Sequence, residues 1–184
     1  MIDPSFTPLP LGEGLGVRAR LFRKLRVSLT RSCNFACVYC AADGKAVVDP
    51  QVTQPEKFLR WIDQILQVQP IHKIRLTGGE PTLSPHFLDA IRYARDVGYF
   101  AVQCATNGLR FAREPGFAKQ AKEAGLRMAY LQFDGVSNES NAHRKISNLF
   151  DVKLRAIEEL SAAGIDVILV VTVVNGVNND QVGT

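Results

Sequence analysis

The stretch that decides the fold is residues 31–40, which read Arg-Ser-Cys-Asn-Phe-Ala-Cys-Val-Tyr-Cys. Three of the chain's four cysteines, Cys33, Cys37 and Cys40, lie here in a C-x-x-x-C-x-x-C arrangement. Thiolates are soft, strong metal ligands, and three on one short loop can converge on a single centre. Residues 25–30 alternate apolar and polar side chains, as a strand does. The pattern therefore predicts a metal site on a loop that follows a strand.

Two kinds of metal centre fit this spacing. A [4Fe-4S] cluster held by three cysteines keeps one iron open to a non-protein ligand. A structural zinc ion instead needs a closed shell of four protein ligands. The remaining candidates for a fourth ligand lie far along the chain: Cys104, His72, His86 and His143. The spacing favours the cluster, and a non-catalytic domain that binds zinc or an iron–sulfur centre is the alternative.

Length and composition are those of one ordinary globular domain. The chain has 184 residues, of which 46% are hydrophobic, and this is enough to fill a single core. Its formal net charge of +4 is too small to indicate nucleic-acid binding. The cysteines do not resemble a secreted disulfide framework, and no apolar run suits a membrane span or a signal peptide. We therefore expect a cytoplasmic protein with no transmembrane segment and no nucleic-acid partner.

The two ends of the chain differ from its middle. Prolines and glycines punctuate residues 1–20 too densely for a helix or a strand, so we expect a disordered leader there, or a segment that caps one end of the fold. The core domain is expected at residues 21–184, truncated at its C-terminus because no helix pattern follows the last strand. Basic residues at the start of this domain, Arg26 among them, are expected at a solvated edge.

From residue 25 onward, strand patterns alternate with helix patterns. Strands are expected at 25–30, 71–77, 99–105, 128–133 and 167–174, and helices at 53–68, 85–97, 115–124 and 149–163. The expected caps are Thr53 with Glu56, Ser84 and Asn148. The β-branched run in 167–174 is typical of a buried parallel strand. Together these patterns predict an α/β fold with a parallel sheet of about five strands, open or curled into a barrel.

Glycine-rich or polar turns follow each expected strand. Ligands bind at the carboxyl ends of the strands in parallel sheets and barrels alike. Besides the cysteine loop, these turns are residues 78–81 (Gly-Gly-Glu-Pro), 106–108 (Thr-Asn-Gly), 134–135 (Asp-Gly) and 175–178 (Asn-Gly-Val-Asn). In the first of them, two glycines let a ligand approach the backbone, and Glu80 supplies a carboxylate for an ammonium group. Any one of these segments could be an ordinary turn without a function. Because all of them follow strand ends on the same side of the sheet, together they favour a single binding site.

The cysteine loop with Tyr39 just before Cys40, followed after the second strand by Gly78-Gly79-Glu80-Pro81, resembles the radical S-adenosylmethionine (radical SAM) enzyme superfamily. The resemblance covers about residues 25–178 and implies a partial parallel (β/α) barrel. It also implies a [4Fe-4S] cluster on the three cysteines, with S-adenosylmethionine on the open iron. An electron from a donor such as flavodoxin or ferredoxin would then cleave S-adenosylmethionine. The resulting 5′-deoxyadenosyl radical would take a hydrogen atom from a small-molecule substrate.

The same resemblance assigns residues to S-adenosylmethionine. The turn of Gly78, Gly79 and Glu80 would hold the methionyl amino group. Adenosine contacts are expected from Tyr39 at the adenine, Asp134 at the ribose, and Thr106, Asn107 and Thr172. Each of these adenosine contacts has an ordinary alternative as a core, sheet or turn residue.

Within the superfamily, two parts of the chain resemble different members. Residues 25–30, 40–44 and 73–81 look like the molybdenum-cofactor enzyme that rearranges GTP, whereas 131–135 resembles tetraether-lipid-synthase-like members. Lys73 and Arg75 alternate onto one strand face, so they could reach an anionic substrate together or simply be solvated. Cys104 is expected to be a small buried core residue rather than an auxiliary cluster ligand.

Overall fold

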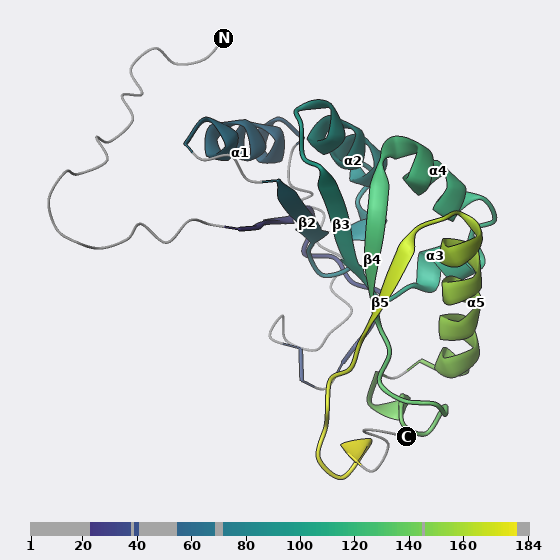
Figure 1. Cartoon of the computed structure of the whole chain (residues 1–184). Coiled ribbons are helices and arrows are strands. Elements are labelled where there is room, and N and C mark those ends of the chain that lie inside the picture. Colours follow the sequence, from purple (N-terminus) through teal and green to yellow (C-terminus); the bar gives the residue numbers. More distant parts are fainter. Residues whose placement is uncertain (1–22, 38, 41–54, 69–71, 145, 180–184) are drawn as a thin grey trace, which may run out of the picture.

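The computed structural model describes residues 23–37, 39–40, 55–68, 72–144 and 146–179. Five parallel strands form one sheet in the order β1-β2-β3-β4-β5, with helices along its outer face (Figure 1). The strands are β1 Leu25–Ser28, β2 Lys73–Thr77, β3 Ala101–Thr106, β4 Leu126–Gln132 and β5 Asp166–Val170. The helices are α1 Pro55–Val68, α2 Phe87–Asp96, α3 Leu109–Arg113, α4 Phe117–Ala124 and α5 Leu149–Ala162, with short 3-10 turns η1 Pro81–Leu83 and η2 Ala142–Arg144.

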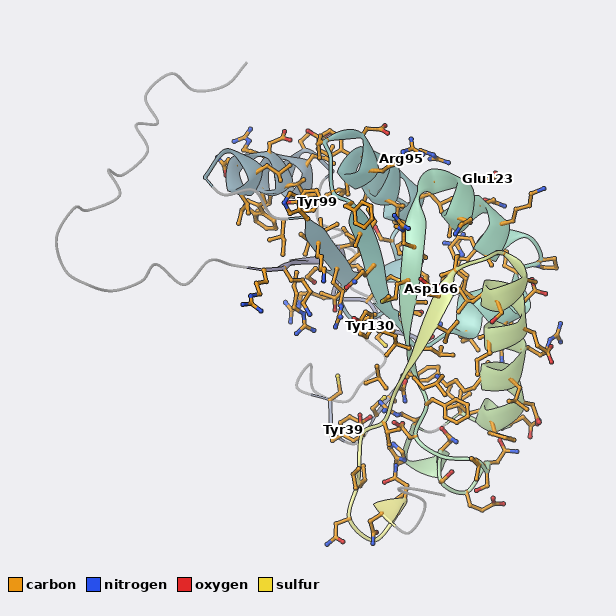
Figure 2. The ribbon with its side chains drawn as sticks, viewed as in Figure 1. Tyr39, Arg95, Tyr99, Glu123, Tyr130 and Asp166 are labelled. Atoms are coloured by element: carbon orange, nitrogen blue, oxygen red, sulfur yellow. The ribbon has the colours of Figure 1, made fainter. Side chains whose placement is uncertain are left out.

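The strand order equals the sequence order, which is what successive βαβ units produce. All four strand pairs are parallel, and β1 is not paired with β5. The sheet is therefore an unclosed part of a (β/α) barrel, as the sequence predicts. All carboxyl ends lie at one edge: Tyr39 follows β1 at this end, and Tyr99 precedes β3 at the opposite end (Figure 2).

The core lies between the sheet and the outer helices. Ile74, Leu76 and Val102 from the strands are almost fully buried against helical residues. Phe117 of α4 contacts the rings of Phe87 and Phe111, at centroid distances of 5.9 and 5.0 Å. Cys104 is fully buried in the same core, where burial raises the pKa of its thiol. It has the core position that the sequence predicts.

The last strand differs from the prediction. β5 ends at Val170 and is not buried, since Leu169 and Val171 are 48% and 50% exposed. Within the described residues, β5 is an edge strand that pairs only with β4. After Val170, the backbone bonds to a side chain instead of to a neighbouring strand: the Thr172 amide donates a hydrogen bond to Asp134 Oδ1 at 2.9 Å. The β-branched run therefore indicates strand propensity correctly but burial wrongly.

Two helix starts also differ from the prediction. α2 begins at Phe87 because the η1 turn precedes it, and Ser84 Oγ accepts from the His86 amide just before the helix. Asn148 does not cap α5 with its side chain; instead Asn138 Oδ1 accepts from the Phe150 amide at 2.9 Å. The predicted cap at Thr53 and the predicted leader lie outside the described residues. Among the described residues, no helix has the length and apolar character needed to cross a membrane.

Candidate cofactor site at the carboxyl ends of the strands

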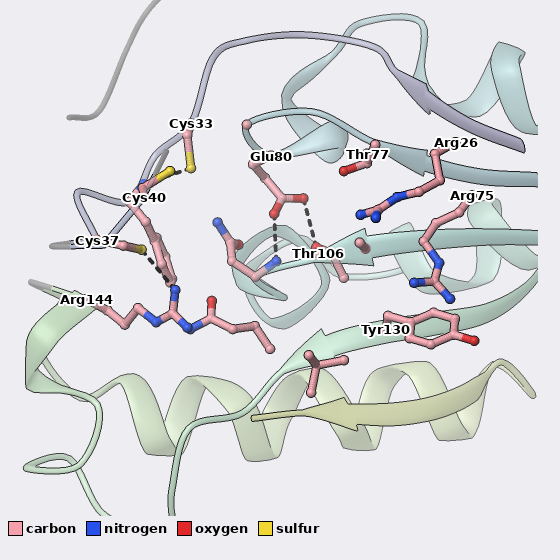
Figure 3. Close-up of a pocket in the computed structure, with 16 residues that line it drawn as sticks. Arg26, Cys33, Cys37, Cys40, Arg75, Thr77, Glu80, Thr106, Tyr130 and Arg144 are labelled. Atoms are coloured by element: carbon pink, nitrogen blue, oxygen red, sulfur yellow. Dashed lines mark hydrogen bonds between the residues drawn. The ribbon is translucent and has the colours of Figure 1, made fainter. Parts of the chain in front are cut away.

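A cavity of about 290 Å³ lies at the carboxyl ends of the strands, beside the cysteine loop (Figure 3). Six of the predicted site residues line it: Cys33, Cys37, Cys40, Gly79, Glu80 and Asn107. Thr106, another expected adenosine contact, lines it too. Tyr39, Gly78, Asp134 and Thr172 do not belong to its lining. The structure thus brings the three thiols together with residues of the second and third strand ends.

Phe35 anchors the cysteine loop. Its side chain is 3% exposed and belongs to a small apolar cluster with Leu109 and Leu149. Its amide donates a hydrogen bond to Cys33 Sγ at 3.4 Å. Burial raises the pKa of the Cys33 thiol, and this hydrogen bond opposes the rise. The apolar residue inside the loop therefore fixes the loop to the fold while the thiols line the cavity.

The glycine turn is tied directly to the cysteine loop. The amides of Gly79 and Glu80 donate to the carbonyls of Thr30 and Ser32, both at 2.8 Å. A Cβ atom on Gly79 would lie 2.3 Å from the Ser32 carbonyl oxygen, which is far too close. The sequence interpretation that the glycine leaves room for a ligand is therefore incomplete. The space is taken by the backbone of the cysteine loop itself.

Glu80 joins the ends of two strands. Its carboxylate is buried and accepts from the Thr82 amide and hydroxyl, from the Thr106 hydroxyl at 2.8 Å and from the Asn107 amide at 2.6 Å. Burial raises the pKa of this carboxyl group, and the hydrogen bonds oppose the rise. Glu80 also lines the cavity, so this geometry allows its predicted contact with the methionyl ammonium, which stays a prediction.

Asn107 and Lys153 extend the hydrogen-bond network that Glu80 begins. Asn107 Nδ2 donates to Asn34 Oδ1 in the cysteine loop at 2.7 Å. The Asn107 carbonyl accepts from the ammonium of Lys153, a fully buried residue of α5. Burial lowers the pKa of Lys153 to about 7. The sequence analysis missed this residue because a single lysine in an amphipathic helix pattern looks like a solvated one.

The predicted adenosine contacts Tyr39, Asp134 and Thr172 gather around an arginine that the sequence analysis missed, Arg144. Asp134 is buried and accepts from Arg144 Nε at 2.6 Å, while the Arg144 guanidinium lies 4.5 Å from the Tyr39 ring centroid. His143 Nε2 lies 3.2 Å from Asp134 Oδ2, and the His143 ring lies 5.6 Å from that of Tyr39. The ribose and adenine contacts stay predictions; in this structure the Asp134 carboxylate is enclosed by protein partners.

A pair of arginines lies at the end of the cavity away from the cysteines (Figure 3). Arg26 and Arg75 are register partners on β1 and β2, and both line the cavity (Figure 3). Arg75 Nη2 donates to Gln103 Oε1 at 3.3 Å, and its guanidinium carbon lies 3.3 Å from the Tyr130 ring centroid. Lys73 is exposed and does not line the cavity, which favours the solvated alternative for this residue, whereas Arg75 lines the cavity. Arg26 is exposed on the edge strand β1, which agrees with the predicted solvated edge, and it also lines the cavity.

The number of thiols at the cavity bears on the two candidate metal centres. A [4Fe-4S] cluster can be held by three cysteines, with one iron left open to another ligand, whereas structural zinc needs a fourth protein ligand. Cys104, the possible fourth zinc ligand, is not in the lining. The donor set therefore fits the cluster better than zinc.

Comparison with known proteins identifies the family. Residues 27–184 match the radical SAM superfamily. The chain belongs to this superfamily. It is 35% identical over 161 residues to 7,8-dihydro-6-hydroxymethylpterin dimethyltransferase of Methanocaldococcus jannaschii, covering 85% of this chain and 31% of that protein. It is 34% identical over 168 residues to GTP 3′,8-cyclase of Heliobacterium modesticaldum, covering 89% of this chain and 50% of that protein.

Solved radical SAM structures share the fold. Methylornithine synthase superposes with a TM-score of 0.65 at 15% identity, over 88% of this chain and 47% of that one. Streptococcus suis SuiB bound to S-adenosylmethionine superposes with a TM-score of 0.62 at 12% identity, over 81% of this chain and 32% of that one. The chain thus spans half or less of the length of each of these four proteins.

We predict that Gly79→Ala loosens the cysteine loop. The added Cβ would force the Ser32 carbonyl away, so the buried Cys37 thiol should react markedly faster with a thiol reagent in the apo protein. Gly116→Ala is the control for backbone strain away from the site, because its φ of +79° disfavours a side chain although the added Cβ would meet nothing within 4 Å. Unchanged Cys37 reactivity in folded Gly79→Ala would contradict the tie between the two turns.

We also predict a pH effect from Lys153. Its pKa of about 7 lies below its unfolded value, so between that pH and about 10 the unfolded chain binds one more proton. Stability should therefore rise with pH over this range, by up to about 1.4 kcal/mol per pH unit from this one group. Denaturant unfolding at several pH values measures this slope. In Lys153→Met the slope should be smaller; equal slopes in both proteins would contradict the assignment.

Proposed function

We propose that this chain is the catalytic core of a radical SAM enzyme acting on a small-molecule substrate. Cys33, Cys37 and Cys40 would hold a [4Fe-4S] cluster, and S-adenosylmethionine would occupy the adjoining cavity. When bound, these groups supply a carbon radical that takes a hydrogen atom from the substrate. The observation that carries the proposal is the shared cavity, which is lined by the three thiols together with Gly79, Glu80 and Asn107.

The protein residues have distinct tasks in this proposal. Glu80 and the turn that contains it offer acceptors for the methionyl ammonium, next to the thiols. Phe35 and its apolar partners close the side of the loop that faces the fold. Cys40 is exposed, so an electron donor such as flavodoxin or ferredoxin could approach the cluster from outside. A reducing cytoplasm would keep the thiols available for the cluster.

The substrate is proposed to carry an anionic group. Arg26 and Arg75 present two guanidinium groups in the cavity, and Arg75 Nε has no hydrogen-bond partner among the described residues. Slight burial, and then the nearby charges of Arg75, Arg26 and Lys73, lower the pKa of Lys24, the residue just before β1. Guanidinium groups bind phosphate and carboxylate through paired hydrogen bonds. A relative named for GTP makes a nucleoside triphosphate the first compound to test.

We predict that Cys33→Ser, Cys37→Ser and Cys40→Ser each lose bound iron after anaerobic reconstitution, whereas Cys104→Ser keeps it. The first three thiols line the cavity, but Cys104 is buried in the core behind the sheet. Iron, sulfide and zinc are measured per chain. Zinc without sulfide in the wild-type protein would support the non-catalytic metal-binding alternative instead, and so would equal losses in all four variants.

We predict that Arg26→Gln weakens binding of GTP at least about tenfold, because a hydrogen bond to a charged group contributes about 1.5–3 kcal/mol. Isothermal titration of the anaerobic protein measures the affinity. Arg92→Gln on α2 is the matched control, since Arg92 is exposed and pairs only with Asp89 at 2.7 Å among the described residues. GTP binding that is absent in the wild type, or equal in both variants, would contradict an anion subsite for nucleotides.

A further inference from the structure

Arg144 places a buried guanidinium against one of the three thiols. It ends the η2 turn, and its side chain is only 6% exposed. Its Nη1 donates to Cys37 Sγ at 3.1 Å, as the dashed line in Figure 3 marks. The sequence distance between the two residues is 107 positions, so the contact depends on the folded domain. The Cys33 thiol, by contrast, accepts its hydrogen bond from a backbone amide, that of Phe35.

The direction of this hydrogen bond is fixed by two other groups. Asp134 Oδ2 accepts a hydrogen bond from Arg144 Nε at 2.6 Å and lies 2.5 Å from Arg144 Nη2. The carboxylate therefore covers the edge of the guanidinium that these two nitrogens form. The Tyr39 ring covers its face at 4.5 Å. Asp134 is itself held by the Thr172 amide and by Gln132 Nε2. The remaining arm, Nη1, is therefore held in position toward the sulfur of Cys37.

A fixed cationic donor at a ligand sulfur has a definite electrochemical effect. Hydrogen bonds to the sulfurs and the local charge set the reduction potential of an iron–sulfur cluster. One-electron reduction makes the cluster more negative, so a neighbouring cation stabilises the reduced form more than the oxidised form. The Asp134 carboxylate offsets part of this effect, but it binds the edge of the guanidinium made by Nε and Nη2. The Nη1 donor is the part that contacts the thiol.

We propose that Arg144 raises the reduction potential of the cluster through its hydrogen bond to Cys37, in an orientation set by Asp134 and Tyr39. The inference rests on the proposed cluster function. It assigns a tuning role to a residue that is not itself a ligand of the cluster. The ion pair Arg144–Asp134 is then part of the machinery that makes the cluster reducible by a low-potential donor.

The test replaces the ion pair by a neutral, polar pair, Arg144→Gln with Asp134→Asn, because removing one partner alone would leave a buried charge unpaired. Wild-type and variant proteins are reconstituted anaerobically, and iron content is measured. Midpoint potentials are then determined without S-adenosylmethionine, by dithionite titration monitored by electron paramagnetic resonance. The control is Arg110→Gln with Glu114→Gln, since Arg110 also combines an ion pair with an aromatic contact, over Phe117, but makes no contact with a cysteine among the described residues.

The double variant should keep its cluster but become at least about tenfold harder to reduce at a given potential, which corresponds to a midpoint about 59 mV more negative for one electron. The control pair should keep the wild-type midpoint. An unchanged midpoint with full iron content would overturn the inference and leave the cluster proposal standing. Loss of iron in the double variant alone would also overturn it, because Arg144 would then be a structural residue. A wild-type protein that binds no cluster would contradict the proposed function and this inference together.

Discussion

The candidate site depends on one close backbone contact between the turns that follow β1 and β2. The amides of Gly79 and Glu80 donate to the carbonyls of Thr30 and Ser32, and no side chain fits at position 79. This contact places the start of the cysteine loop above the second strand end. From there Phe35 fixes the middle of the loop in an apolar cluster, and the thiols are left at the cavity.

Buried charges surround this contact, and each is hydrogen-bonded. Glu80 accepts hydrogen bonds from three residues, Lys153 donates to the Asn107 carbonyl, and Asp134 pairs with Arg144. Buried charged groups are costly unless they are paired, so such a network specifies one arrangement of the rim. The cysteine loop is therefore held in place by polar contacts around it, and not by its own short sequence alone.

Much of the fold could be predicted from the sequence because its signals are local. Alternation of strand and helix patterns gives the parallel sheet, and the spacing of Cys33, Cys37 and Cys40 gives the candidate metal loop. Burial of the last strand was predicted wrongly, since an apolar run does not say how many neighbours a strand has. The cap of α5 was assigned to Asn148, whereas Asn138 supplies it from a loop twelve positions before the amide that it binds.

The residues that sequence reasoning missed are cations that act across long distances in the chain. Arg26 is placed at the cavity by the register of β1 with β2. Arg144 contacts Cys37 across 107 positions of the chain, and Lys153 of α5 lies 5.3 Å from the Phe35 ring centroid. Lone basic residues are usually solvated, so their pattern carries little information before the fold is known. Gly79 is a similar case. The sequence indicates a close backbone approach at this position, but only the structure shows that the approaching atom is the Ser32 carbonyl oxygen.

In the proposed site, three thiols leave one iron of a cluster open beside the cavity. Electron paramagnetic resonance of the reduced, reconstituted chain, recorded before and after addition of S-adenosylmethionine, tests this most directly. We expect a [4Fe-4S] signal whose g-values change when S-adenosylmethionine binds to the open iron. A cluster signal that S-adenosylmethionine leaves unchanged at saturating concentration, or the absence of any cluster signal, would contradict it.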